Sequence, residues 1–308
     1  VAFAFPIVTL SDTDVLKVRR GEDWRRSGHN STTQVVDKPH HHTVDHYAAA
    51  ARSLARAGAE DLAVWGHDHE GAYRQCPLRD PSSAFLLLPT EAGPMLFCHA
   101  VLLFGALGAV WGYGRLSDLL VHLARCLLAI PALHYVDDFG GIERSASAPS
   151  AFSAFEDFNT YLGYVMKKAK RQPPAPAQAV QGVILELSRR GAVFRPKPVR
   201  VRRMELLIDS VLAKGVLTPA TAGSMAGKCG FLATTCYGRV GRAPVRPLFA
   251  RQHQVHADFG ISTALASALW CLRALFRAAP PRELPFEAER PTPLLYADAF
   301  FNIGGESF

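Results

Sequence analysis

The chain has 308 residues, of which 49% are hydrophobic, which is enough to bury the core of one large domain or of two to three small ones. Its net charge of +7 favours a polyanionic partner, although charge alone says nothing about the fold. No two of the six cysteines form a C-x-x-C pair, so neither a zinc knuckle nor a disulfide framework is indicated, and a reducing compartment is the default.

The apolar segments of the chain do not predict a membrane span. Val1–Leu10 is too short and lacks a basic leader. Leu119–Ile130 is interrupted by His122 and Arg125 and is typical of a buried helix. We therefore expect no membrane partner and an intracellular location in the cytoplasm or nucleus. Because the chain starts at a valine and ends abruptly at Phe308, we expect it to be a piece of a longer polyprotein.

The N-terminal third begins with a basic and aromatic stretch over residues 17–30, whose guanidinium and ammonium groups suit phosphate contact. A solvated basic loop is an equally good interpretation. The histidine run His40–His42 does not by itself make a metal site, because consecutive side chains diverge and a tetrahedral site would need distant ligands. An alanine-rich helix is expected over Tyr47–Ala57, with Gly58 just beyond its end.

A buried strand is predicted over Leu62–Trp65, and it ends near Asp68. Asp68 is either a turn cap or a functional acid placed at a strand end. The flanking residues His67 and His69 either support that acid or lie in the core or on the surface.

The next elements are a hairpin and a long helix. The apolar runs Ala84–Leu88 and Met95–Leu103 predict two paired strands, joined by a proline- and glycine-containing connection. A glycine-rich turn then leads into a buried helix over Leu107–Leu128. Glycines at such a turn let the backbone approach a ligand closely.

Two adjacent carboxylates, Asp137 and Asp138, lie between the apolar runs 129–135 and 139–142. This pattern predicts a hairpin with an acidic tip. Consecutive strand residues point to opposite faces, so a tight turn is needed to bring both acids near one site. Clustered hard oxygen ligands at a strand end are what Mg²⁺ prefers.

The middle of the chain predicts a helix over Ala151–Leu162 with Ser150 as its N-cap, followed by a basic segment over 165–170. We expect the proline- and alanine-rich stretch Gln172–Gln178 to be a loop. A second hairpin is predicted from Val180–Leu187 and Ala192–Arg195.

The C-terminal third predicts helices and then a linker. An amphipathic helix is expected over Val201–Lys214, and another begins with Thr218 as N-cap and a proline at its first position. Pro280–Pro293, with five prolines, is typical of a linker. A strand containing Asp298 follows it.

The acidic boxes and their order resemble those of retroelement reverse transcriptases, of the LTR/gypsy-like or DIRS-like kind. Tyr135-Val136-Asp137-Asp138 is similar to the active-site box of that family, and Ala72 and Tyr73 follow Asp68 at the family's spacing. The segment 103–113 resembles a further family box. Residues 222–232 resemble the thumb helix, and 294–305 resemble the start of a ribonuclease H domain. The order of these motifs carries more weight than any single match.

The resemblance implies an α+β right-hand polymerase with an antiparallel palm sheet backed by helices. Residues 1–190 would form the fingers and palm, 191–279 a helical thumb and connection, and 280–308 a linker with a truncated ribonuclease H-like start. One acid from that last segment cannot assemble a two-metal site, so we expect no nuclease activity from this chain.

The resemblance also implies roles for individual residues. Asp68, Asp137 and Asp138 would bind two Mg²⁺ ions, with Mn²⁺ as a substitute, to add dNTPs to a primer paired with an RNA or DNA template. Tyr73 would crowd a ribose 2′-hydroxyl. The predicted substrate contacts are Phe104, Gly105, Arg19 and Lys170, with Lys168 as the alternative to Lys170. The predicted nucleic-acid contacts are Tyr135, Lys228 and Arg239.

Two alternatives stay open at this point. A decayed retroelement remnant would bind nucleic acid without polymerising, and Val110 and Gln181, which stand where the family has proline and leucine, leave room for it. An unrelated hydrolase using Asp137 and Asp138 would explain neither the Ala72-Tyr73 spacing nor the thumb-like segment.

Overall fold

A computed structural model describes residues 1–10, 15–34, 36–38, 40–236, 240–254, 259–278 and 280–287. This part of the chain has a mixed α+β fold with eight α-helices and three four-stranded sheets. The helices are α1 His29–Thr32, α2 Val44–Arg56, α3 Leu107–Leu128, α4 Ala148–Tyr161, α5 Pro198–Lys214, α6 Pro219–Ala233, α7 Arg242–Gln252 and α8 Thr263–Ala278.

The central sheet carries the acidic residues, and its strands run in the order β6-β7-β3-β8. All three pairings are antiparallel. Six of the seven residues of β3 are buried, because both faces of the sheet are covered. The strands are β3 Leu62–Asp68, β6 Ala132–Tyr135, β7 Asp138–Arg144 and β8 Gln172–Ala175.

Each face of the central sheet packs against a different layer. Trp65 and Phe139 lie with side chains of α3 and α4, and Phe155 is fully buried there. Val64 and Ile142 lie on the other face, with α2 and the sheet of order β12-β11-β10-β9. That second sheet consists of β9 Ala177–Val180, β10 Val183–Leu187, β11 Gly191–Pro196 and β12 Arg282–Pro285.

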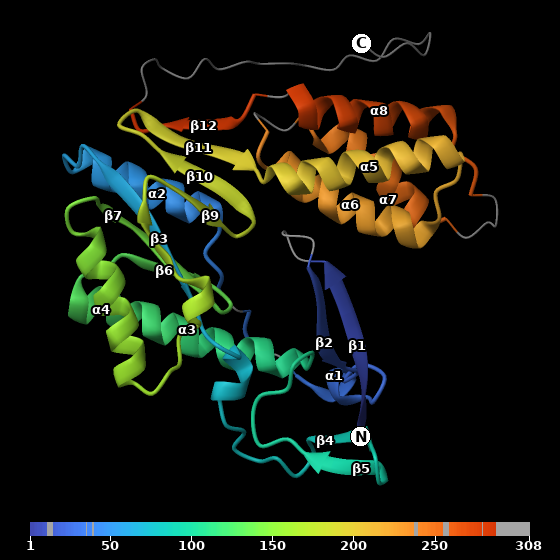
Figure 1. Ribbon diagram of the computed structural model, residues 1–308, viewed down its shortest axis with the longest axis horizontal. Helices are drawn as coiled ribbons and strands as arrows, with labels where there is room; N and C mark the ends of the chain where they lie inside the picture. Colours follow the sequence, from blue (N-terminus) through green and yellow to red (C-terminus); the bar gives the residue numbers. More distant parts are fainter. Residues whose placement is uncertain are drawn as a thin grey trace.

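The third sheet lies at the end of the molecule that carries the N-terminus and has the order β2-β1-β4-β5 (Figure 1). Strand β1 pairs antiparallel with β2 and parallel with β4. A small core around Trp24 and Leu86 anchors it. Its strands are β1 Ala2–Leu10, β2 Leu16–Glu22, β4 Phe85–Thr90 and β5 Gly93–Cys98.

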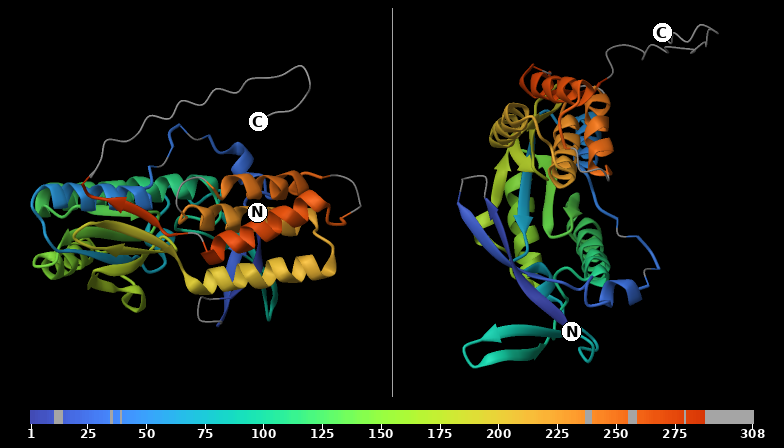
Figure 2. Two further views of the ribbon diagram at one scale, coloured as in Figure 1. Left: turned by 90° about the horizontal axis from the view of Figure 1, so that it is seen from above. Right: turned by 90° about the vertical axis from the view of Figure 1, so that its right-hand side faces the viewer.

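Helices α5–α8 form a separate bundle that both figures show gathered at one end of the molecule (Figures 1 and 2). Its core includes Ile208, Met225 and Leu269, all fully buried. Thr218 caps α6, accepting a hydrogen bond from the Thr221 N–H at 3.3 Å, with a proline at the first helical position. This confirms the cap expected from the sequence.

Several elements differ from the sequence-based expectations. Helix α4 begins at Ala148 rather than Ala151, so Ser147 rather than Ser150 is its N-cap residue. Pro149 fits into the first turn, where a backbone N–H would lack an intrahelical partner. The expected loop Gln172–Gln178 instead contains β8 and the start of β9.

The expected linker Pro280–Pro293 also contains a strand, since β12 pairs with β11 from Arg282 to Pro285. Proline is tolerated there because β12 is an edge strand. Arg239 and Asp298 lie outside the described residues. Among the described helices, none combines the length and the hydropathy needed to cross a membrane.

All six cysteines are free, and their different burial predicts different thiol reactivity. Burial raises the pKa of Cys229 to about 12, so the thiolate that reacts is scarce at pH 8. We expect Ellman's reagent at pH 8 to modify the exposed Cys98, Cys126 and Cys271 first, and Cys229 only on unfolding. Mass spectrometry of a partly modified sample checks this, and early modification of Cys229 would contradict its position in the α5–α8 core.

Candidate active site

The hydrogen-bonded register of β3 and β7 brings two acids from distant parts of the sequence together. Asp68, the last residue of β3, lies directly opposite Asp138, the first residue of β7. Such paired positions place the two Cα atoms about 4.5–5.5 Å apart. The strand register thus brings Asp68 and Asp138 together at one strand end, and their roles stay a prediction.

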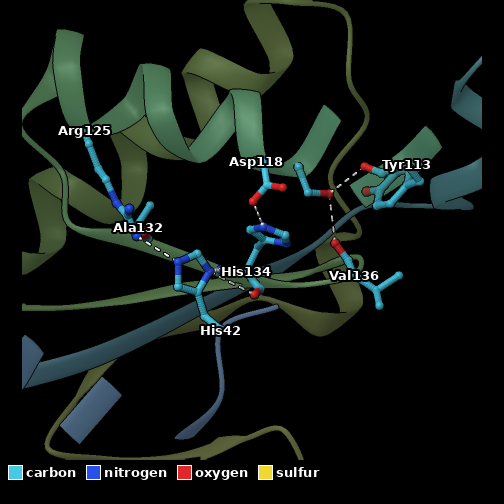
Figure 3. A network of polar contacts seen from close by, with 8 residues as sticks. His42, Tyr113, Asp118, Arg125, Ala132, His134 and Val136 are labelled. Carbon is cyan, nitrogen blue, oxygen red and sulfur yellow. Dashed lines mark hydrogen bonds and ion pairs between the residues drawn. The ribbon is translucent and has the colours of Figure 1, made fainter. Parts of the chain in front are cut away.

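Asp137 occupies the two-residue turn between β6 and β7, together with Val136. Val136 has φ 55°, a left-handed conformation that is uncommon for a β-branched residue. Helix α3 supports this turn, because the Ser117 hydroxyl donates to the Val136 carbonyl at 2.9 Å (Figure 3). Strained backbone conformations that contacts from other elements stabilise are common at functional sites.

The carboxylates of Asp68, Asp137 and Asp138 all interact electrostatically with the ammonium group of Lys170. Its ammonium group pairs with the buried carboxylate of Asp68 and lies 3.9 Å from Asp138. Partial desolvation, a hydrogen bond with Asp68 and the charge of Asp137 raise the pKa of Asp138 to about 7, although about half of its side chain is exposed. Burial and the charge of Asp68 also raise the pKa of Asp137.

This crowding predicts a pH-dependent effect of Asp138→Asn in chelator-treated protein. An acid whose folded-state pKa is raised destabilises the fold when ionised, so its cost is absent below the unfolded-state pKa of about 4 and grows until the pH passes about 7. We expect Asp138→Asn to melt at a higher temperature than the wild type at pH 8.5. The difference should be clearly smaller at pH 5, as thermal unfolding at both pH values can show. An equal difference at both would contradict the raised pKa.

The donor set suits a hard divalent cation, since the crowded oxygens are carboxylates and their mutual repulsion favours a positive ion among them. The ligands are not arranged in advance, however. Within the described ranges, no group of three or more His, Cys, Asp or Glu side chains is arranged to hold a metal ion. The two-ion Mg²⁺ site, with Mn²⁺ as a substitute, therefore stays a prediction.

Asp68 and Asp138 line a cleft with a volume of about 660 Å³. Arg19 on β2, Tyr135 and Lys170 line it, as the sequence had suggested for substrate or nucleic-acid contact. Four further lining residues were not predicted as site residues from the sequence, namely Tyr47, Lys197, Arg200 and Phe231. A basic residue at a helix start was the only available signal for Lys197 and Arg200.

Gln181 and Gly182 also line the cleft, in the tight turn between β9 and β10. Both have positive φ, 47° and 86°, which two-residue hairpin turns favour. The Gln181 amide donates to the His42 carbonyl at 2.6 Å, which ties this turn to the segment before α2.

Tyr73 lies on one segment, where the charge of Asp137 reaches it, and Phe104 and Gly105 lie together on another. The lining of the cleft does not include these three residues. The Tyr73 ring follows Asp68 on a short 3₁₀ turn and lies 6.1 Å from the Phe104 ring, centroid to centroid. Gly105 has φ +93°, and a Cβ there would lie 3.0 Å from the Glu22 carbonyl. Asn30 fixes this turn by donating to the Gly105 carbonyl and accepting from the Leu107 N–H.

Two groups of histidines pack in the core around the central sheet. His67 stacks on Phe152 at 4.1 Å and is a core residue. His42 packs beside the buried His134, which contacts Asp118 on α3 at 2.8 Å (Figure 3). Burial lowers the pKa of His42 to about 4, so this cluster is neutral near pH 7.

Lys228 lies exposed on α6, in a second, neighbouring pocket that Thr9 of β1 and Arg200 also line. The predicted contact of Lys228 with nucleic acid stays a prediction. Lys168, the alternative to Lys170, is exposed in the same 3₁₀ turn, whereas the Lys170 ammonium pairs with Asp68 and the acids raise its pKa against the lowering effect of its burial. The geometry therefore favours Lys170.

Solved structures of a foamy viral protease-reverse transcriptase resemble this chain. The structure in complex with double-stranded DNA has a TM-score of 0.61 at 14% identity, over 90% of this chain and 44% of that one. The structure in complex with an RNA/DNA hybrid has a TM-score of 0.61 at 13% identity, over 90% and 33%. No family profile and no curated protein matches the sequence.

The chain thus spans less than half the length of the two viral proteins. At this identity the likeness concerns the fold, and this chain has a reverse-transcriptase-like fold. The element type, LTR/gypsy-like or DIRS-like, stays a prediction, as does the ribonuclease H start.

Proposed function

We propose that the chain is an RNA-directed DNA polymerase of a retrotransposon, which adds dNTPs to the 3′-hydroxyl of a primer on an RNA or DNA template. The observation that carries this proposal is the register that places Asp68 opposite Asp138 at the floor of a cleft with basic side chains. The structural likeness to proteins solved with DNA and with an RNA/DNA hybrid supports the same class of partner.

In this proposal, Asp68, Asp137 and Asp138 hold two Mg²⁺ ions. Bound Mg²⁺ would lower the pKa of the primer hydroxyl and neutralise charge on the triphosphate. Lys170 pairs with Asp68 in the structure, and in this proposal its ammonium would exchange that partner for the leaving pyrophosphate and supply a proton there. Arg19 lines the same cleft and would neutralise phosphate charge.

The right-hand arrangement is part of the proposal. The central sheet with α3 and α4 would be the palm, the β1–β2 and β4–β5 sheet the fingers, and the α5–α8 bundle the thumb, with boundaries near residues 190 and 280. Gly227 and Gly230 of α6 support a close external approach, because a Cβ at either would meet nothing within 4 Å. The fold itself does not require glycine there, whereas alanine would favour the helix.

Primer extension on an RNA template with dNTPs and Mg²⁺ tests the proposal, with Asp137→Asn alongside. We expect extension by the wild type only, with template–primer binding retained in the variant. Full extension by Asp137→Asn would show that the acidic turn is not the reaction centre. Replacing RNA by DNA template, and Mg²⁺ by Mn²⁺, defines the template and ion preference.

A second candidate is a catalytically decayed remnant that only binds nucleic acid. The pairing of the Lys170 ammonium with the Asp68 carboxylate favours it, because the lysine already neutralises that acid. Duplex binding by the wild type with no incorporation in Mg²⁺ or Mn²⁺ would select this candidate.

A further inference from the structure

A buried polar network connects the residue after Asp68 to the ring that contacts Tyr73. His69 Nδ1 lies 2.6 Å from the Tyr113 hydroxyl, and His69 Nε2 lies 3.0 Å from Asn159 Oδ1. His69, Tyr113 and Asn159 are each at most 1% exposed. These side chains come from the end of β3, from α3 and from α4, so one hydrogen-bonded chain joins three elements.

The network fixes which atom donates each proton. The Asn159 amide nitrogen donates to the Phe155 carbonyl at 2.8 Å, so its oxygen is the group that faces His69. That oxygen can only accept, and His69 Nε2 must therefore carry the hydrogen. A neutral His69 then accepts at Nδ1, and the Tyr113 hydroxyl donates to it. Every polar atom of the His69 ring is thereby satisfied, which fixes the rotation of the Tyr113 ring in the core.

The fixed ring contacts Tyr73, which is proposed to face the substrate. The Tyr113 ring meets the Tyr73 ring edge-to-face, with centroids 5.3 Å apart and an angle of 80°. Tyr73 is half-buried and has the Phe104 ring on another side. Edge-to-face contact depends on the orientation of both rings, so the hydroxyl bond to His69 restrains Tyr73 indirectly.

We propose that Tyr113 is a positioning residue for Tyr73 and that the Tyr113–His69 hydrogen bond sets how strongly the site discriminates between deoxyribonucleotides and ribonucleotides. This inference rests on the proposed function, in which the Tyr73 ring crowds the ribose 2′-hydroxyl. A Tyr73 ring held in one orientation excludes that hydroxyl, and a ring free to tilt admits it.

Tyr113→Phe is the direct test, because it keeps the ring and removes only the hydroxyl bond. We expect the ratio of kcat/KM for dNTP over rNTP to fall by a factor of about 2 to 10, the range expected for one neutral hydrogen bond. The change should lie mainly in the KM values, with kcat for dNTP nearly unchanged. Tyr161→Phe, at a tyrosine that is 92% exposed on α4, is the matched control and should leave the ratio unchanged.

The Tyr73→Ala background separates positioning from a general structural effect. If Tyr113 acts through Tyr73, Tyr113→Phe should leave the dNTP/rNTP ratio unchanged once Tyr73 is alanine. An equal loss for both nucleotides, or the same shift of the ratio in the Tyr73→Ala background, overturns the inference. His69→Phe removes the acceptor from the other side and should shift the ratio in the same direction, which keeps the test available if Tyr113→Phe does not fold.

A spectroscopic measurement keeps the inference testable apart from the proposed function. In protein labelled with ring carbon-13 tyrosine, the Tyr73 signals are assigned by their loss in Tyr73→Phe. We expect these signals to shift or broaden in Tyr113→Phe and not in Tyr161→Phe. If the wild type extends no primer, the proposed function fails, and the spectrum still tests whether Tyr113 positions Tyr73. A Tyr73 signal that is unchanged in Tyr113→Phe would overturn that contact.

Discussion

Asp68→Asn should abolish nucleotide addition while leaving a folded protein. Asp68 is only 4% exposed, faces Asp138 in the strand register and pairs with Lys170. Losing one charged ligand of a metal-assisted transfer removes several kcal/mol of stabilisation, a fall in rate of about a thousandfold or more. Asparagine has nearly the same shape, and its introduction also removes a charge that raises the pKa of Asp138.

Single-nucleotide incorporation under saturating dNTP and Mg²⁺ measures this effect, with Asp61→Asn as the matched control. Asp61 immediately precedes β3 but is largely exposed, and its contact with Arg189 at 3.3 Å lies on the surface. Such an exposed pair contributes little to stability, because water and salt screen it, and the control should retain activity. Comparable incorporation by Asp68→Asn and the wild type would remove Asp68 from the reaction centre.

Gly140→Ala should strongly destabilise the fold. A Cβ at Gly140 would lie 2.6 Å from the Trp65 carbonyl oxygen and 2.6 Å from the Tyr47 hydroxyl. The carbonyl belongs to the backbone of β3 and cannot turn aside, so β7 must move away from β3 and carry Asp138 with it. We expect a loss of about 3 kcal/mol, at the upper end of overpacking costs, together with a large loss of primer extension.

Urea unfolding followed by tryptophan fluorescence measures the stability loss, and Gly230→Ala is the control. Gly230 lies within α6, where a Cβ would meet nothing within 4 Å. Alanine favours a helix interior, so this variant should gain up to about 1 kcal/mol. A Gly140→Ala variant as stable as the wild type would mean that the β3–β7 contact is looser than the structure describes.

The elements with strong local signals agree with the structure. The acidic hairpin, the strand leading to Asp68 and the cap at Thr218 each depend on a few neighbouring residues. Strands β8 and β12 were missed because proline lacks the backbone N–H of a paired strand, and the sequence does not show which strands will lie at an edge. At an edge, one unpaired side accommodates proline without losing a ladder hydrogen bond.

Residue types and their spacing were enough to predict the chemical groups of the site: three acids, a lysine at 170, an aromatic residue five positions after Asp68, and an order of motifs that resembles reverse transcriptases. These features are local, because spacing and residue type can be read along the chain. The packed fold was needed to show that Lys170 rather than Lys168 reaches Asp68, that Arg200 and Phe231 line the cleft, and that His69 contacts the Tyr113 hydroxyl. Each of these contacts joins residues from separate elements, and their meeting depends on how sheets and helices pack, which no local pattern encodes.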